Sequence, residues 1–242
     1  MLQVRFVGSG DAFGSGGRFQ TCIHLQTDGH TLLLDCGATS LTALKAQQLD
    51  PNAIDAVVLS HLHVDHFGGV PPLILDGQFT RRTTPLTVAG PAGTAQRLSE
   101  AMEIMFPGSS SVQRRFGVTV LELDPAAPTT VPGATIQSWP VNHGIHALAH
   151  RLTLGGTTVA YTGDTAWTDA LTELATGTDL FIAEAYFWDK HVPHHLRHAD
   201  LLEHTDQLAS ARTILTHMST DMLAHADHAA FDLAHDGLSL TL

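Results

Sequence analysis

The stretch VVLSHLHVDHFGGVPPL, residues 57–73, places three histidines and an aspartate within six positions, directly after an apolar run. On a strand, side chains at positions i and i+2 share a face, so His61 and His63 are expected to lie together. On the turn that follows, Asp65 and His66 can face a second centre nearby. Such crowding at a partly desolvated strand end is costly unless the groups share a partner. Imidazole and carboxylate suit zinc, and also iron or manganese, so the stretch predicts a metal site.

Cysteine usage indicates the kind of metal site. The chain has only Cys22 and Cys36, whereas structural zinc sites are usually rich in cysteine, so an open catalytic site is expected. The opening MLQVRFVGSGDAFGSGG shows no basic region followed by an apolar segment, as a secretory signal would. We therefore expect a cytoplasmic protein in which both cysteines are small core residues.

Length and charge limit the class of partner. The 242 residues contain no linker long enough to separate two domains, which predicts a single domain over residues 1–242. The formal net charge of −12 repels a polyphosphate backbone, so no large nucleic acid is expected as a partner. No apolar run approaches the ~20 residues that span a bilayer, so no membrane partner is expected. A small-molecule substrate remains the expected partner.

Short β-type runs alternate with helix-like segments, which predicts an α/β or α+β layered fold. Helices are expected near residues 40–48, 68–75, 93–106, 167–175 and 199–209. Three further polar residues come at the ends of apolar runs: His143 in NH after SWPV, Asp164 after VAYTG and His217 after TILT. Ligands of layered α/β folds bind outside the strand ends. If these ends meet at one edge, the three residues converge on the first cluster.

The run HLHVDH resembles the H-x-H-x-D-H signature of the metallo-β-lactamase superfamily, and the later residues follow in that superfamily's order. His143 in PVNHG is similar to the third ligand histidine, Asp164 in YTGDT to the bridging aspartate, and His217 in ILTHMS to the last histidine. The resemblance implies a four-layer αββα sandwich with two divalent metal ions, zinc in the first instance, with Mn²⁺ or Fe²⁺ as alternatives. One metal ion would be held by three histidines: His61, His63 and His143. The other would be held by Asp65, His66 and His217, with Asp164 between the two ions.

Two segments are similar to one branch of the superfamily, that of ribonuclease Z and small-molecule phosphodiesterases. They are the glycine-rich VGSGDAFGSGGRFQTC and the region PVNHGIHALAHRL. In ribonuclease Z a glutamate pairs with a downstream histidine that protonates the leaving group, and the matching residues here are Glu184 in AEAY and His198 in RHAD. The phosphodiesterase of phosphonate breakdown has a similar N-H-x-D element, which matches His198 and Asp200. A helix cap is an equal alternative for Asp200, and a satisfied strand-end carboxylate is one for Glu184.

The chain also departs from that branch. Ribonuclease Z that cuts transfer RNA has a long arm between its third ligand and its bridging aspartate, but His143 and Asp164 are only 21 positions apart, so no arm fits. The phosphonate enzyme has an extra cysteine-based zinc site, for which this chain offers only Cys22. The run DKHVPHHLRH adds three histidines, for which a solvated loop is expected and an accessory metal site is the alternative: His191, His194 and His195.

Together these features predict a dinuclear metal-dependent hydrolase, a phosphodiesterase of the cyclic nucleotide or cyclic sugar-phosphate type. Metal-bound hydroxide would attack phosphorus and His198 would act as general acid. The residues expected to take part in catalysis are Asp65, Glu184, His198 and Asp200. Carboxylic esters, lactones or sulfate esters are alternative substrates. A tRNA-processing ribonuclease Z, a redox di-iron protein and a non-catalytic binding protein are less favoured. Homodimers are common in the branch that the chain resembles, so a second copy of this chain is a further expected partner.

Overall fold

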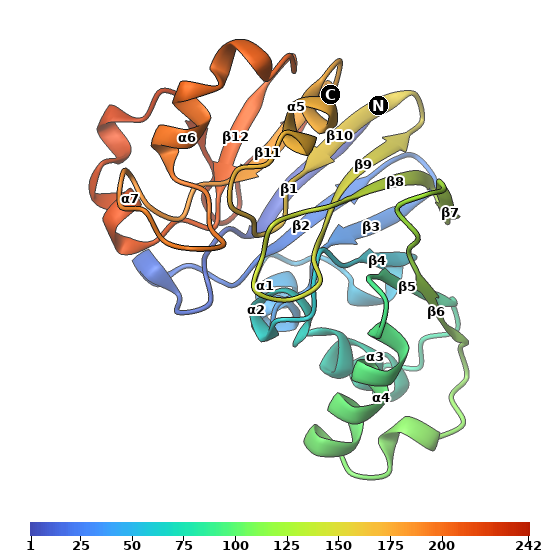
Figure 1. Ribbon diagram of the computed structural model, residues 1–242. Helices are drawn as coiled ribbons and strands as arrows, with labels where there is room; N and C mark the ends of the chain where they lie inside the picture. Colours follow the sequence, from blue (N-terminus) through green and yellow to red (C-terminus); the bar gives the residue numbers. More distant parts are fainter.

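The computed structural model describes residues 1–242 and consists of two seven-stranded β-sheets that pack face to face between two groups of helices (Figure 1). The first sheet has the strand order β14 (Ser239–Thr241), β1 (Gln3–Gly8), β2 (Cys22–Gln26), β3 (Thr31–Leu34), β4 (Ala56–Val58), β5 (Leu86–Gly90) and β6 (Val118–Glu122). The second has the order β13 (Asp232–Leu233), β12 (Thr213–Thr216), β11 (Leu180–Glu184), β10 (Thr157–Tyr161), β9 (Leu148–Leu154), β8 (Ala134–Pro140) and β7 (Thr129–Val131).

Seven α-helices connect and cover the sheets: α1 (Ser40–Ala46), α2 (Val64–Phe67), α3 (Val70–Phe79), α4 (Thr94–Met105), α5 (Ala170–Ala175), α6 (His198–Glu203) and α7 (Thr220–Ala224). Five 3₁₀ turns accompany them: Ser15–Gly17, Pro51–Ala53, Ser109–Ser111, Thr205–Gln207 and Ala226–His228. Helix α6 ends earlier than the sequence pattern predicts, because the Thr205 hydroxyl binds the carbonyls of Leu201 and Leu202 and competes with a further helical turn. No helix combines the length and apolarity needed to cross a bilayer.

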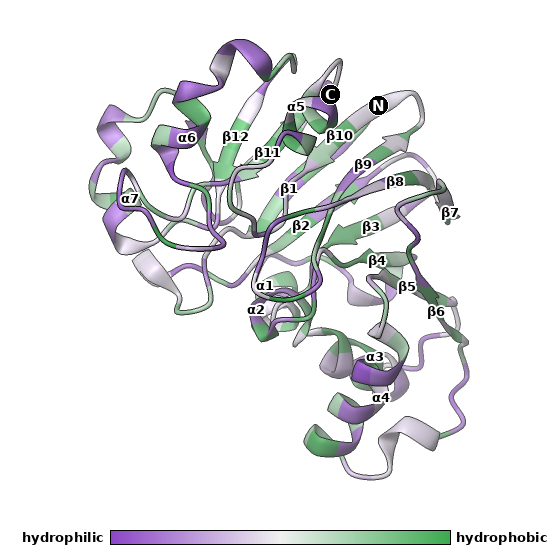
Figure 2. Cartoon of the chain, viewed as in Figure 1, coloured by the Kyte–Doolittle hydropathy of each residue, from purple (hydrophilic) through white to green (hydrophobic).

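Three apolar clusters hold the four layers together. A cluster of 24 buried residues fills the space between the two sheets. A second cluster of 18 lies between the first sheet and helices α1 to α4, and a third of 14 between the second sheet and helices α5 to α7. Figure 2 shows the same partition, with green along the strands and much of the purple on loops and outward helix turns. The predicted αββα sandwich is therefore confirmed.

Parallel strand pairs bring the polar residues to one edge. Strands β3 and β4 run parallel, with Leu34 opposite Val58, and β10, β11 and β12 run parallel in the second sheet. Strands buried on both faces read as continuous apolar runs, which explains AVV in β4 and LFIAE in β11. Polar side chains that follow the carboxyl ends of these strands therefore meet where the two sheets open.

Candidate metal centre

Three histidines form the first group of the site. His61 follows β4, His63 lies just before α2, and His143 follows β8. Nε2 of His61 and Nε2 of His143 each lie 3.1 Å from Nδ1 of His63. His61 is buried, His143 is half-buried and His63 is exposed. The group is therefore open to solvent on one side.

Four buried residues form the second group, with ligand atoms within 4.8 Å of one another: Asp65, His66, Asp164 and His217. Nε2 of His217 lies 3.2 Å from Nε2 of His66 and 3.2 Å from Oδ2 of Asp65. Asp65 and His66 come from α2, and His217 follows β12. The second group thus joins the two sheets and is closed to solvent.

Asp164 lies between the two groups. Its Oδ1 is 3.3 Å from Nε2 of His66, and its Oδ2 is 3.8 Å from Nε2 of His61. Burial opposes ionisation, but the charges of His217 and His66 outweigh it and hold the pKa of Asp164 well below its usual range. One carboxylate therefore faces both groups, as a bridging ligand would.

The arrangement of nitrogens fits metal ions. At the first group, Nδ1 of His63 faces both Nε2 of His61 and Nε2 of His143. A single proton on Nδ1 of His63 cannot form hydrogen bonds with both of these nitrogens. Oδ1 of Asp164 is buried without a hydrogen-bond donor. Burial and the neighbouring positive charge of His66 lower the pKa of His61, which favours the neutral imidazole that binds metals. Divalent cations would accept these lone pairs, so the residues present fit two such ions.

Hydrogen bonds on the far side of the His61 and His143 rings set their tautomers. The Ser60 hydroxyl donates to Oδ2 of Asp35 (2.8 Å), so its lone pair accepts from Nδ1–H of His61 (3.0 Å). Nδ1–H of His143 donates to the carbonyl of His194 (3.0 Å). The nitrogens that face the centre therefore carry lone pairs, as ligand imidazoles require.

Asp35 supports the site and was missed by the sequence analysis. Its fully buried carboxylate accepts from Nδ1–H of His66 (2.7 Å), from the Tyr161 hydroxyl (2.7 Å) and from the backbone N–H and hydroxyl of Ser60 (2.7 and 2.8 Å). Asp35 directly follows the apolar run TLLL, so the pattern that singled out Asp164 could have found it.

Glu184 pairs with His195 and not with His198, so that prediction was wrong. Oε2 of Glu184 lies 3.0 Å from Nδ1 of His195, and Oε1 accepts from the N–H of Thr165. Nδ1 of His195 is also 3.9 Å from Oδ2 of Asp164, at the edge of the metal groups. The loop before α6 returns to the sheet at His195, which explains why this histidine is half-buried instead of solvated.

His198 faces away from the site because it is the first residue of α6. It is buried, its ring stacks on Trp188 (4.1 Å between centroids), and its Nε2 accepts from the N–H of Ala230 (3.0 Å). Asp200 accepts from the N–H of Arg197 (2.9 Å) and binds its guanidinium, so it caps the start of α6. The cap alternative for Asp200 is therefore the one observed.

The pKa of both members of the Glu184–His195 pair is raised. Burial alone would lower the pKa of His195, but the hydrogen bond and charge of Glu184 outweigh it and raise that pKa. Burial and the charge of Asp164 raise the pKa of Glu184. A proton shared between carboxylate and imidazole is what a general acid needs near neutral pH.

Backbone strain gathers at the site. Asp35 and His217 both have φ of 57°, and His194 has φ of 71°. Non-glycine residues rarely adopt this left-handed region, and such conformations persist where the surroundings fix them. Asp35 and His217 supply side-chain contacts at the site that glycine could not make, and His194 holds its carbonyl against the ring of His143.

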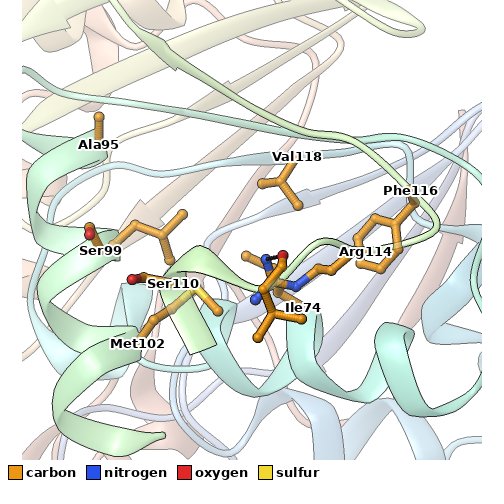
Figure 3. Close-up of a pocket in the computed structure, with 10 residues that line it drawn as sticks. Ile74, Ala95, Ser99, Met102, Ser110, Arg114, Phe116 and Val118 are labelled. Atoms are coloured by element: carbon orange, nitrogen blue, oxygen red, sulfur yellow. Dashed lines mark hydrogen bonds between the residues drawn. The ribbon is translucent and has the colours of Figure 1, made fainter. Parts of the chain in front are cut away.

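One cavity lies apart from this cluster. It measures about 310 Å³ and lies between α3, α4 and β6 (Figure 3). Its lining is mostly apolar, with Ile74, Met102 and Phe116 among the walls, and contains none of the residues of the two metal-binding groups. The acid–base and metal-binding chemistry is therefore outside this cavity.

Sequence comparisons place the chain among known proteins. The family model described as anti-Pycsar protein Apyc1 matches residues 2–236. Ribonuclease Z of Methanococcus maripaludis is 30% identical over 152 residues, which cover 62% of this chain and 48% of that protein. Ribonuclease Z of Lachnoclostridium phytofermentans is 30% identical over 146 residues, covering 60% and 46%. The chain thus spans about half the length of the curated relatives it matches.

Solved structures agree on the architecture. The metallo-β-lactamase fold protein YhfI of Bacillus subtilis superposes with a TM-score of 0.81 at 21% identity, covering 100% of both chains. The short form of human tRNase Z gives 0.80 at 22% identity, covering 99% of this chain and 98% of that one. A diphosphatase of the PhnP family gives 0.81 at 22% identity, covering 100% and 98%. At these identities the likeness shows the fold.

Proposed function

Because the chain belongs to the family of the anti-Pycsar protein Apyc1 and is a hydrolase of the metallo-β-lactamase superfamily, we propose that it is a dinuclear metal-dependent phosphodiesterase. Its substrates are small phosphodiesters of the cyclic nucleotide or cyclic sugar-phosphate type. The observation that carries this proposal is the pair of ligand groups with Asp164 between them, and the Glu184–His195 pair beside them. The curated relatives carry the name of a ribonuclease, an enzyme that cleaves phosphodiester bonds.

The first group would hold one ion and the second group the other. When bound, two such cations supply positive charge for a phosphoryl oxygen and a water of lowered pKa. The second group is buried, whereas His63 of the first is exposed, so substrate approaches from the side of the first group. Zinc is the proposed metal, because imidazoles predominate among the ligands.

His195 then serves as the general acid. Glu184 accepts from Nδ1–H, which leaves Nε2 as the atom that donates a proton to the departing alkoxide. Thr165 fixes the other oxygen of Glu184 and so holds the pair in place. Because the His195 side chain is 22% exposed, its outer edge can reach a bound substrate.

The test is hydrolysis of a substrate panel by metal-loaded protein. Bis(p-nitrophenyl) phosphate and cyclic nucleotides should be cleaved, and Asp164→Ala should reduce the rate to background. His191→Ala is the matched control, since His191 is exposed on the same loop as His195, and should retain wild-type rates. Faster turnover of lactones, carboxylic esters or sulfate esters than of any phosphodiester would contradict the proposal.

A further inference from the structure

Tyr186 lies beside both the acid histidine and the buried metal group. It follows Glu184 by two residues, in the loop between β11 and α6. Its ring centroid is 4.8 Å from that of His195 and 5.8 Å from that of His217. The side chain is half-buried, so one part packs on the site and another part is open. No motif had singled this residue out.

The backbone of Tyr186 is fixed from two sides. Its N–H donates to the carbonyl of Leu196 (2.9 Å), and its own carbonyl accepts from the N–H (3.0 Å) and the hydroxyl of Ser219. Phe187 meets the ring edge-on at 4.7 Å. The phenol therefore has a fixed place between the loop that carries His195 and the segment that follows His217.

The hydroxyl of Tyr186 forms no hydrogen bond with another group of the protein. The other tyrosine, Tyr161, donates its hydroxyl to Asp35 at 2.7 Å. The Tyr186 ring lies beside His195 and His217, and burial together with the charges of nearby carboxylates, Asp11 and Asp164 foremost, raises its pKa. The Tyr186 hydroxyl is therefore a hydrogen-bond donor that has no acceptor within the protein.

No arginine or lysine forms an ion pair with the two metal-binding groups or with Glu184. Every ion pair of the two metal-binding groups and of Glu184 joins a histidine to a carboxylate. Anionic phosphoryl oxygens would therefore be met by the metal ions and by hydrogen-bond donors other than arginine and lysine. We propose that the Tyr186 hydroxyl is a catalytic residue that donates a hydrogen bond to a non-bridging phosphoryl oxygen as negative charge builds there. This inference rests on the proposed function.

Tyr186→Phe isolates the hydroxyl, because phenylalanine keeps the ring against His195. Removing one donor that acts in the transition state lowers kcat by about 100-fold, whereas KM should change by less than about 3-fold. Calorimetry should show weakened binding of vanadate, which adopts the five-coordinate geometry of the transition state, with little change for inorganic phosphate. Metal content, Tm and the alkaline limb of the pH profile should stay at wild-type values.

Tyr161→Phe is the contrasting variant. Its hydroxyl supports Asp35, so its loss should lower Tm and metal affinity. If Tyr186→Phe binds its metal ions and is as active as an active wild type, the role of Tyr186 is refuted and the proposed function stands. A loss of kcat in this variant that comes with a shifted alkaline limb refutes the role of Tyr186 in the same way. Wild type that binds two metal ions yet cleaves no phosphodiester refutes the proposed function and the role of Tyr186 with it.

Discussion

Replacing Asp35 with asparagine should weaken metal binding about 10- to 100-fold, the usual effect of losing the group that orients a ligand imidazole. At 1.4 kcal/mol per factor of ten, this is a loss of about 1.4–2.8 kcal/mol of binding free energy. Oδ2 of Asp35 accepts from three donors, on His66, Tyr161 and Ser60, and Oδ1 accepts from the backbone N–H of Ser60. Asparagine offers one oxygen for these four donors.

Both orientations of the amide are unfavourable. If its oxygen takes the place of Oδ2, the amide NH₂ faces the N–H of Ser60 across 2.7 Å, and an unsatisfied buried donor costs about 1–3 kcal/mol. If the NH₂ takes the place of Oδ2, Nδ1 of His66 can only accept. His66 then carries its proton on Nε2, the atom that faces His217 and the metal. The second orientation blocks the ligand outright.

Competition with a fluorescent chelator measures metal affinity, and thermal unfolding with and without added metal measures stability. Asp55→Asn is the matched control, since Asp55 accepts from the N–H of Thr31 (2.9 Å) at the opposite end of the same strand, β3. It should leave metal affinity unchanged. The reasoning would be refuted by an Asp35→Asn variant that binds metal as tightly as wild type.

Four further substitutions test the rest of the site. His195→Ala should slow hydrolysis of substrates with poor leaving groups by about 10²- to 10⁴-fold and that of nitrophenyl esters much less. Equal losses for good and poor leaving groups would exclude His195 as the acid. His198→Ala, in contrast, should lower Tm and leave kcat unchanged. Glu184 raises the pKa of His195, so Glu184→Gln should move the alkaline fall in activity to lower pH by about one pH unit or more. A pH–rate profile measures this, and an alkaline limb at the wild-type pH would show that Glu184 does not set the pKa of the acid. Gly163→Ala should lower the free energy of unfolding by about 2–4 kcal/mol, because φ is +56° and the new Cβ would lie 2.6 Å from Cβ of Ser60; a wild-type Tm by calorimetry would contradict the clash.

Much of the metal centre could be predicted because its signals are local. His61, His63, Asp65 and His66 lie within six residues, and His143, Asp164 and His217 each lie one to three residues after the end of a strand. The layered fold followed from the same alternation of strands and helices. The structure brings all seven residues together at one edge.

The acid histidine was harder to predict, since the sequence RHADLLEH permits a helix start at several residues. The helix begins at His198, and this choice turns His198 inward and leaves His195 on the loop beside Glu184. A difference of three residues therefore separates His198, which packs on Trp188, from His195, the proposed acid. The carbonyl of His194 carries no side-chain signal at all, so its hydrogen bond with His143 could not be anticipated.

One loop, residues 185–197, contacts the site at two points. It carries His195 and presents the carbonyl of His194 to His143, and its two ends are joined by the hydrogen bond from the N–H of Tyr186 to the carbonyl of Leu196. Outward displacement of this segment by a bulky ligand would release the proton donor and let the His143 ring rotate at the same moment. Substrate size and retention of a metal ion at the first group would thereby be linked, and insertions in this segment would alter both traits together during divergence of the family.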